Sequence, residues 1–331
     1  MFTPLKGCTG FEAGSIEIIT AANRNRAYIL TTPVHSGTYV LHLDSGYNAQ
    51  YGWARFPVAG TPSELYVGVW VRPDGNYYGE IGFYVTSGHY VGLRHDGTYW
   101  DAYVDGSKVA DGTCAHAGAS WHLVELHVIV GDSGTIESRV DGVVDITYSG
   151  DTKPGATTAI SYVRLYQYVT GLGNDADSYW DDFTMGTGGW PGDIRYASAL
   201  VPNADTAQKD WTPSTGVDNY AMVDEKPPSD ADYVSAGSVN FKDLYTLSNW
   251  SAGANEEPRF IVDWVRAKKD VADSCFMEYI VKSGSTESSS GSFALTTDFV
   301  YYGRVLDNDP DTAAEWTANA INALDVGQMR S

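Results

Sequence analysis

Hydrophobic and polar positions alternate over many short segments in the first half of the chain. In residues 64–72 every second residue is leucine or valine, with bulkier or polar residues between them. This period of two is that of a β-strand with one buried face. Asp-Gly pairs at 96–97, 105–106 and 141–142 have the composition of hairpin turns. Such frequent turns predict an antiparallel sandwich or jelly roll. Further strands are expected at 79–86, 90–94, 98–104, 107–110, 121–130, 135–140, 143–148, 159–168 and 179–185.

The pattern changes after the glycine-rich segment 186–192, which we interpret as a linker between two domains. Residues 201–228 contain several prolines and are expected to be irregular. Alternation then predicts strands at 260–266, 274–281, 291–295 and 300–305. We therefore predict an all-β protein with two antiparallel β-sandwich (jelly-roll) domains, residues 1–187 and 188–331, and one short C-terminal helix.

The C-terminal helix is predicted from a period near 3.6. Trp316 and Leu324 fall on the same face as Ala320 and Ile321, so we expect both to be buried. Asp311 or Thr312 supplies the N-cap, and Gly327 is expected to end the helix.

The acidic composition of the chain excludes some classes of binding partner. The chain has 331 residues with 21 Lys and Arg against 42 Asp and Glu, a net charge of −21. Nucleic acids and anionic membranes need clustered cations, so neither is an expected partner. The first seven residues lack the apolar stretch of a signal peptide, and we interpret Cys8, Cys114 and Cys275 as free thiols of a reducing compartment.

Catalytic motifs do not stand out. The Glu-x-Asp-x-x-Glu or Glu-x-Asp-x-Glu spacing of sandwich glucanases is missing. Glu125 stands two residues from His127, and we interpret them as polar strand residues. An enzyme on this fold would need paired carboxylates, or a set of Tyr, His and Arg, converging on the concave face. The sequence pattern does not single out such a set.

Three carboxylates suggest a structural calcium site. Glu12 belongs to the expected first strand, and Asp181 and Asp182 begin the last strand of the first domain. The first and last strands of a sandwich are commonly neighbours, so these oxygens could hold one hard cation. The alternative is that the carboxylates accept backbone N–H groups at a strand end.

Several aromatic residues stand among polar residues and glycines. Exposed rings beside Asp and Asn suit stacking on the apolar face of a sugar. The alternative is that the rings build the core and subunit contacts. The candidate glycan-binding residues are Tyr47, Tyr51, Trp53, Tyr77, Tyr78, Tyr99 and Trp100.

Two stretches carry a resemblance to known families. Trp121-His-Leu-Val-Glu125, the Val-Asp-Gly hairpin at 140–142 and Tyr179-Trp-Asp-Asp-Phe183 resemble LamG-like, concanavalin-A-like jelly rolls. Residues 189–331, with segments 220–233 and 309–327, resemble a C-terminal β-sandwich module of virion proteins in tailed bacteriophages.

This resemblance implies a non-enzymatic virion structural protein, of the capsid-decoration or head-fibre type, with a glycan-binding face. The alternatives are a tail receptor-binding protein and a jelly-roll polysaccharide hydrolase or lyase. The implied partners are other virion proteins, host-surface glycans and further copies of the chain, as a trimer. The implied location is a virion assembled in the host cytoplasm.

Overall fold

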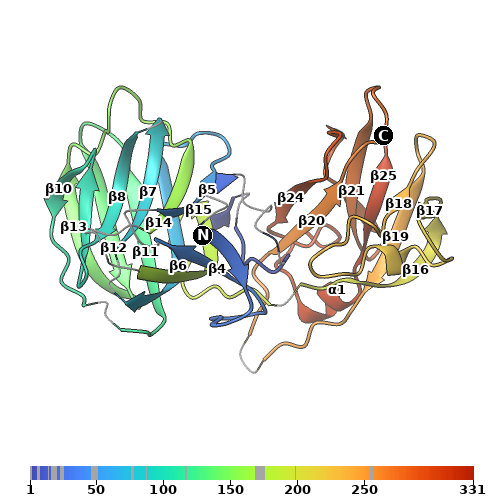
Figure 1. The fold of residues 1–331 in the computed structure, drawn as a ribbon, viewed down its shortest axis with the longest axis horizontal. Helices are drawn as coiled ribbons and strands as arrows, with labels where there is room; N and C mark the ends of the chain where they lie inside the picture. Colours follow the sequence, from blue (N-terminus) through green and yellow to red (C-terminus); the bar gives the residue numbers. More distant parts are fainter. Residues whose placement is uncertain are drawn as a thin grey trace. The chain divides into compact units, whose positions relative to one another are not determined.

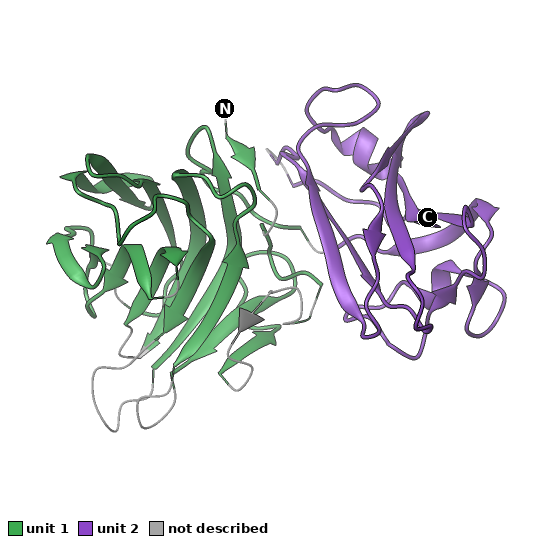
Figure 2. Ribbon diagram, turned by 90° about the horizontal axis from the view of Figure 1, so that it is seen from above, with its two compact units in different colours: residues 1–198 green, residues 199–331 purple. Residues whose placement is uncertain are grey.

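The chain folds into two compact units, Met1–Ser198 and Ala199–Ser331 (Figures 1 and 2). The computed structural model describes residues 2–5, 8–13, 15, 21–22, 26–45, 51–75, 78–86, 88–115, 118–167, 176–197, 199–253 and 256–331. The assignment of domains to residues 1–187 and 188–331 remains a prediction, and residues 188–198 fall in the first unit.

The first unit contains two antiparallel sheets. The larger one is formed by β1 (Thr3–Pro4), β3 (Ala27–Leu30), β4 (Val40–Asp44), β6 (Glu64–Gly75), β11 (His122–Ile129), β12 (Gly134–Val140), β13 (Val143–Gly150) and β15 (Ala176–Thr187). Its order is β13-β12-β11-β6-β15-β4-β3, with β1 paired to β15. The other is formed by β2 (Ala21–Ala22), β5 (Gly52–Pro57), β7 (Gly79–Thr86), β8 (His89–His95), β9 (Trp100–Val104), β10 (Ser107–Ala110) and β14 (Tyr162–Gln167). Its order is β10-β9-β8-β7-β14-β5-β2.

The two sheets enclose the core of the first unit. The alternating residues Leu65, Val67 and Val69 of β6 are completely buried, as their period of two predicts. Phe56 of one sheet stacks on Phe183 of the other, with ring centroids 4.1 Å apart. This sandwich leaves each sheet one outward face on which side chains can meet a ligand.

The second unit contains shorter strands. They are β16 (Pro202–Lys209), β17 (Thr212–Pro213), β18 (Val234–Ser235), β19 (Lys242–Leu247), β20 (Ile261–Ala267), β21 (Phe276–Ser283), β22 (Thr286–Ser289), β23 (Phe293–Ala294), β24 (Val300–Leu306) and β25 (Asp325–Arg330). One sheet has the order β16-β19-β25-β21-β22 with β23 paired to β21, and β17-β18 and β20-β24 form two pairs. Two short helices, the 3-10 helix Tyr220–Met222 and α1 (Ala318–Asn322), complete it. The prediction of an all-β fold with one short C-terminal helix is confirmed.

The extent of that helix was predicted wrongly. It begins after Thr317, whose side chain accepts a hydrogen bond from the Ala320 amide at 3.1 Å. It ends at Asn322, and Gly327 lies in β25, between β19 and β21. A Cβ atom on Gly327 would lie 1.9 Å from the carbonyl oxygen of Asp243, so the strand needs glycine there. Residues 202–209, expected to be irregular, form β16.

The buried face of the helix region was predicted correctly. Trp316 and Leu324 are 3% and 4% exposed, in one cluster with Val281 and Ile321. The Trp316 indole also donates to the carbonyl of Leu306 at 2.9 Å. No helix in the described residues has the length and apolar character needed to cross a membrane.

Candidate functional site

The seven-stranded sheet turns an unusual set of side chains outward. Inward positions are filled by residues such as Ala54, Phe56, Val163 and Leu165, so the residues between them face away from the core. The outward residues on β5, β7, β8, β9 and β14 are almost all aromatic or charged. They include Trp53, Arg55, Glu80, Tyr84, Tyr90, Arg94, Asp101, Tyr103, Tyr162, Arg164 and Tyr166.

A buried carboxylate organises the middle of this face. Glu80 is completely buried, and it accepts hydrogen bonds from Arg164 at 2.5 Å and from Arg94 at 3.1 Å. The hydroxyl of Tyr84 also donates to Glu80, at 2.9 Å. Burial, followed by the charge of Glu80, raises the pKa of Tyr84 far above its usual range. Glu80 is therefore a fixed structural anion on which two guanidinium groups are positioned.

Gly82 makes room for this arrangement. It lies opposite Gly92 on the neighbouring strand. A Cβ atom on Gly82 would lie 2.8 Å from the ring of Tyr84 and 3.0 Å from Oε1 of Glu80. A larger residue would push the carboxylate and the ring out of the positions that hold the arginines.

Arg55 differs from the other arginines of this face. It is paired in register with Arg164, but it forms no ion pair with any carboxylate in the described part of the chain. Its guanidinium lies between two rings, 4.6 Å from the centroid of Trp53 and 4.9 Å from that of Tyr162. Its Nε atom is buried and has no hydrogen-bond partner there. Arg55 thus presents a positive charge whose anion is not supplied by the described residues.

Tyr166 stands beside Arg164, the residue paired in register with Arg55. Its ring centroid is 4.3 Å from the guanidinium carbon of Arg164, and its ring stacks on that of Tyr51 at 5.6 Å. Burial raises the pKa of Tyr166 to about 12, although the positive charge of Arg164 opposes the rise. The half-buried Tyr166 is accessible from the outward face, whereas Tyr84 is only 3% exposed.

Of the aromatic residues predicted to bind glycans, some lie at this face. Tyr51 is 42% exposed, and Trp53 is half-buried beneath Arg55. Tyr47 and Tyr77 lie outside the described residues. Tyr51 and Trp53 thus lie on the outward face, and their binding of glycans stays a prediction.

Of the remaining aromatic candidates, Tyr78 directly precedes β7, Tyr99 directly precedes β9 and Trp100 begins β9. Tyr78 is half-buried and Tyr99 is 36% exposed. Trp100 is completely buried and packs edge-on against His95, with centroids 5.2 Å apart. The alternation of β9 points Trp100 into the core, so its ring cannot stack on a sugar.

The three carboxylates proposed for calcium are close to N–H donors. Glu12 accepts hydrogen bonds from the amides of Thr38 and Tyr39, at 2.8 and 3.1 Å. Asp181 accepts from the amide of His35 at 2.9 Å, and Asp182 from its ring nitrogen at 2.7 Å. Burial and the charge of Asp182 raise the pKa of Asp181. Within the described residues no group of three or more His, Cys, Asp or Glu has the arrangement of a metal site. Calcium binding stays a prediction of the sequence.

On the opposite sheet, Glu125 and His127 have separate partners. His127 lies 3.0 Å from Glu64 and stacks on Tyr66 with ring centroids 3.9 Å apart. Glu125, buried between β6 and β12, accepts a hydrogen bond from the Gly192 amide at 2.9 Å. They do not form one polar pair.

Sequence reasoning missed Arg55, Glu80, Arg164 and Tyr166. The available signal was the outward Tyr-Arg-Tyr set at alternate positions of β14. Large aromatic rings around a cation are less common on a solvent-facing strand than small polar residues, so this set indicates a functional face.

Comparisons with known proteins give structural matches only. No family model and no curated protein matches the sequence. A carbohydrate esterase of the Shiga toxin-encoding bacteriophage phi24B matches with a TM-score of 0.41 and 11% identity, over 57% of this chain and 100% of that one. An endo-β-1,4-glucuronan lyase of the fungus Trichoderma reesei matches with a TM-score of 0.40 and 11% identity, over 51% of this chain and 91% of that one.

The alginate lyase Aly36B matches with a TM-score of 0.37 and 14% identity, over 56% of this chain and 96% of that one. The structural neighbours are jelly-roll β-sandwich proteins that act on carbohydrates. These findings contradict the predicted non-enzymatic role as a virion structural protein, because the matched proteins are enzymes. The prediction that the chain is not an enzyme is corrected accordingly.

Proposed function

We propose that the first unit is a carbohydrate-active enzyme that binds an acidic polysaccharide on the outward face of its seven-stranded sheet. The observation that carries this proposal is Arg55, a cation without a carboxylate partner among the described residues, held between two aromatic rings. A guanidinium binds a carboxylate with two parallel hydrogen bonds, and flanking rings stack on the sugar that carries it. A uronic acid offers both features.

The charge of this face supports an acidic substrate. Arg55, Arg94, Arg164 and Lys108 face outward against two carboxylates, Glu80 and Asp101. Lys108 also pairs with Asp111 at 2.6 Å, which leaves a surplus of one positive charge in a chain whose net charge is −21. A local cationic surface within an acidic protein attracts an anionic chain to one face.

The chemistry of the face favours β-elimination over hydrolysis. A glycoside hydrolase needs one carboxyl group as acid and a second as base or nucleophile, both in contact with the sugar. Glu80 is completely buried and bound by two arginines, and Asp101 is 3% exposed and paired with Lys108 at 3.2 Å. The accessible groups are guanidinium and phenol groups, which are suited to elimination.

We infer the following roles. Arg55 pairs with the uronate carboxylate, which stabilises the negative charge that develops when the C5 hydrogen leaves as a proton. Tyr166 takes that proton in its tyrosinate form, which is the minor form below its pKa of about 12 and becomes more populated as pH rises. The C4–O bond to the neighbouring sugar breaks, a C4=C5 double bond forms, and the proton passes from Tyr166 to the leaving oxygen. Tyr166 is then again a tyrosinate, and no co-reactant is consumed.

The test uses alginate, polygalacturonate, glucuronan and hyaluronan as substrates, with ultraviolet absorbance of the new double bond as readout. We expect one of them to be cleaved, faster as pH rises, because the tyrosinate is the base. Arg55→Ala and Tyr166→Phe should each lower kcat/KM by about 10²–10³-fold. Tyr66→Phe, on the other sheet, is the matched control and should leave the rate unchanged. Cleavage without a new double bond, or no cleavage in the whole panel, would refute the elimination.

We further propose that the enzyme works on a phage particle, with virion proteins and further copies of itself as partners and host-surface glycans as substrate. The support is the sequence resemblance of residues 189–331 to a virion module. Mass spectrometry of purified phage particles tests this location, and we expect it to detect the chain. Loss of the chain during purification of the particles would contradict the proposal.

A further inference from the structure

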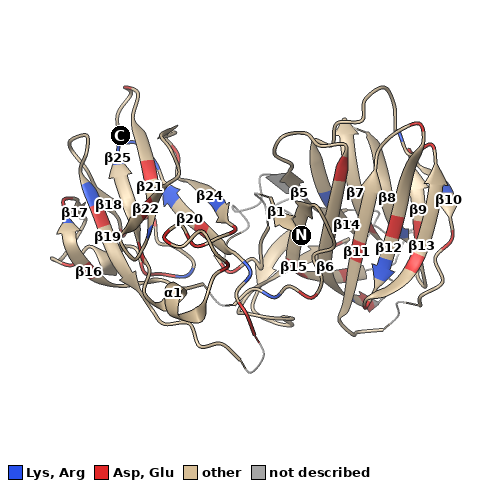
Figure 3. Ribbon diagram, turned by 180° about the vertical axis from the view of Figure 1, so that it is seen from behind, with Lys and Arg blue, Asp and Glu red and all other residues tan. Residues whose placement is uncertain are grey.

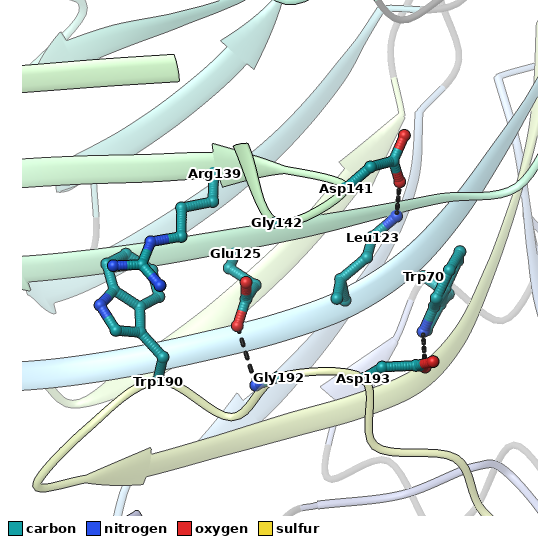
Figure 4. Close-up of a pocket in the computed structure, with 9 residues that line it drawn as sticks. All are labelled: Trp70, Leu123, Glu125, Arg139, Asp141, Gly142, Trp190, Gly192 and Asp193. Carbon is teal, nitrogen blue, oxygen red and sulfur yellow. Dashed lines mark hydrogen bonds between the residues drawn. The ribbon is translucent and has the colours of Figure 1, made fainter. Parts of the chain in front are cut away.

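A pocket lies on the opposite side of the sandwich from the face around Arg55, over β6, β11 and β12 (Figure 4). Residues 190–193 pass across these strands and form one wall. Pro191 lies on Gly68, where a Cβ atom would be 3.3 Å from the proline ring. Because Gly68 has no side chain, the segment approaches the sheet closely and the pocket remains beside it. All of its lining residues belong to the first unit.

Two indole rings border this pocket in fixed orientations. Trp70 stacks on His35 with centroids 3.7 Å apart, and its Nε1 donates to Asp193 at 3.2 Å. Trp190 is covered on one face by the guanidinium of Arg139, 4.0 Å from the ring centroid. Both indoles are half-buried, so each keeps some accessible surface. Rigid, partly exposed rings are the usual surface on which a sugar stacks.

Two polar groups between the rings have hydrogen-bonding capacity left. Glu125 and Arg139 are directly opposite each other on β11 and β12. Glu125 is 3% exposed, and its only hydrogen bond within the described residues is the one from the Gly192 amide. The Nε atom of Arg139 is buried without a partner among those residues, although its NH2 group contacts Glu137 at 3.3 Å. An acceptor beside a donor matches a pair of adjacent sugar hydroxyls, and a buried group left unpaired costs stability.

We propose that this pocket is a second saccharide-binding site, separate from the face around Arg55, and that it takes a neutral sugar residue. Three carboxylates, Glu125, Asp141 and Asp193, line it with one cation, Arg139, and Arg195 pairs with Asp193 at 2.8 Å, so the carboxylates still outnumber the guanidinium groups. This negative surplus repels uronic acids, which is the opposite of the charge around Arg55. Neutral hydroxyls can accept from Arg139 and donate to Glu125 while the sugar ring stacks on indole. The site could hold a neutral part of a glycan independently of any cleavage.

The test begins with the intact chain on an array of neutral and uronic-acid glycans. Calorimetric titration of the best-bound neutral oligosaccharide then follows. We expect a neutral glycan to bind, and Glu125→Gln and Trp190→Ala each to weaken it by at least about tenfold, while Trp190→Phe restores part of the affinity. Arg55→Ala is the matched control and should leave this binding unchanged. Melting curves identify any variant that fails to fold, and Glu125→Gln alters only one atom of the pocket.

The two proposals fail separately. Absence of binding to every neutral glycan would overturn the second site, whatever happens to acidic polysaccharides. The same holds if neutral binding survives both Glu125→Gln and Trp190→Ala, or if it disappears in Arg55→Ala. Cleavage of an acidic polysaccharide should continue in Glu125→Gln, and its loss in that variant would contradict the separation of the two sites.

Discussion

Two carboxylates of this molecule, the buried Glu80 and the half-buried Asp263, differ in the groups that compensate their charge. Glu80 has two arginines and a tyrosine hydroxyl around it, whereas Asp263 in β20 has one arginine, with Arg304 Nε 3.4 Å away. Burial raises the pKa of Asp263 from 3.8 to about 6, because it outweighs the favourable charge of Arg304. The surroundings of Asp263 therefore favour its protonated form.

This predicts a pH-dependent stability for the second unit. The folded state holds the Asp263 proton up to about pH 6, and the unfolded state releases it near 3.8. The stabilisation from this proton is complete below 3.8 and is lost as pH rises through about 6, a fall of about 3 kcal/mol. Asp263→Asn, neutral throughout, should lack this fall. Urea unfolding of both proteins from pH 4 to 7 measures it, and a difference between them that stays constant with pH would contradict the prediction.

At the scale of elements, alternation identified β6, β7, β8 and β11 because every second residue of each strand points into the core. It did not identify β25, since a short segment in which a glycine follows an apolar residue suits a helix end as well as a strand. The pairing of β25 with β19 and β21 decides the outcome. The site around Arg55 could not be predicted from the sequence either, because it also depends on which strands pair. β14 lies between β5 and β7, which are distant from it in the sequence, and only this order brings Arg55, Arg164 and Glu80 together.

The cluster beneath α1 gives a prediction at the same scale. Trp316 is 3% exposed, packs with Val281 and Leu306, and donates to a backbone carbonyl. Trp316→Ala should lower the free energy of unfolding of the second unit by about 3–5 kcal/mol, because it removes a buried ring and leaves a cavity. Thermal unfolding followed by circular dichroism measures this loss. The control Glu315→Ala, at an exposed neighbour, should have little effect, and equal melting of the two variants would argue against this core.

At the scale of the whole molecule, acidic residues lie in both units, whereas both proposed sites lie in the first unit. Acidic residues lie along strands of both units (Figure 3), consistent with the net charge of −21. The outward surplus of cations around Arg55 and the neutral-sugar pocket around Glu125 both belong to the first unit, on opposite sheets of one sandwich. Neither needs a residue from Ala199–Ser331 in the geometry described.

A fragment of residues 1–198 tests whether the face around Arg55 and the pocket around Glu125 work without the second unit. Residues 1–198 form a compact unit with their own core, so this fragment should fold alone and keep both the cleavage of the acidic polysaccharide and the binding of the neutral glycan. The two activities, measured per mole of fragment, should stay within about twofold of the full chain if the second unit contributes no residue to either site. A fragment that shows cooperative unfolding yet lacks an activity would place part of that site in residues 199–331. A fragment that keeps both would leave the second unit free for the attachment role that its resemblance to virion modules suggests.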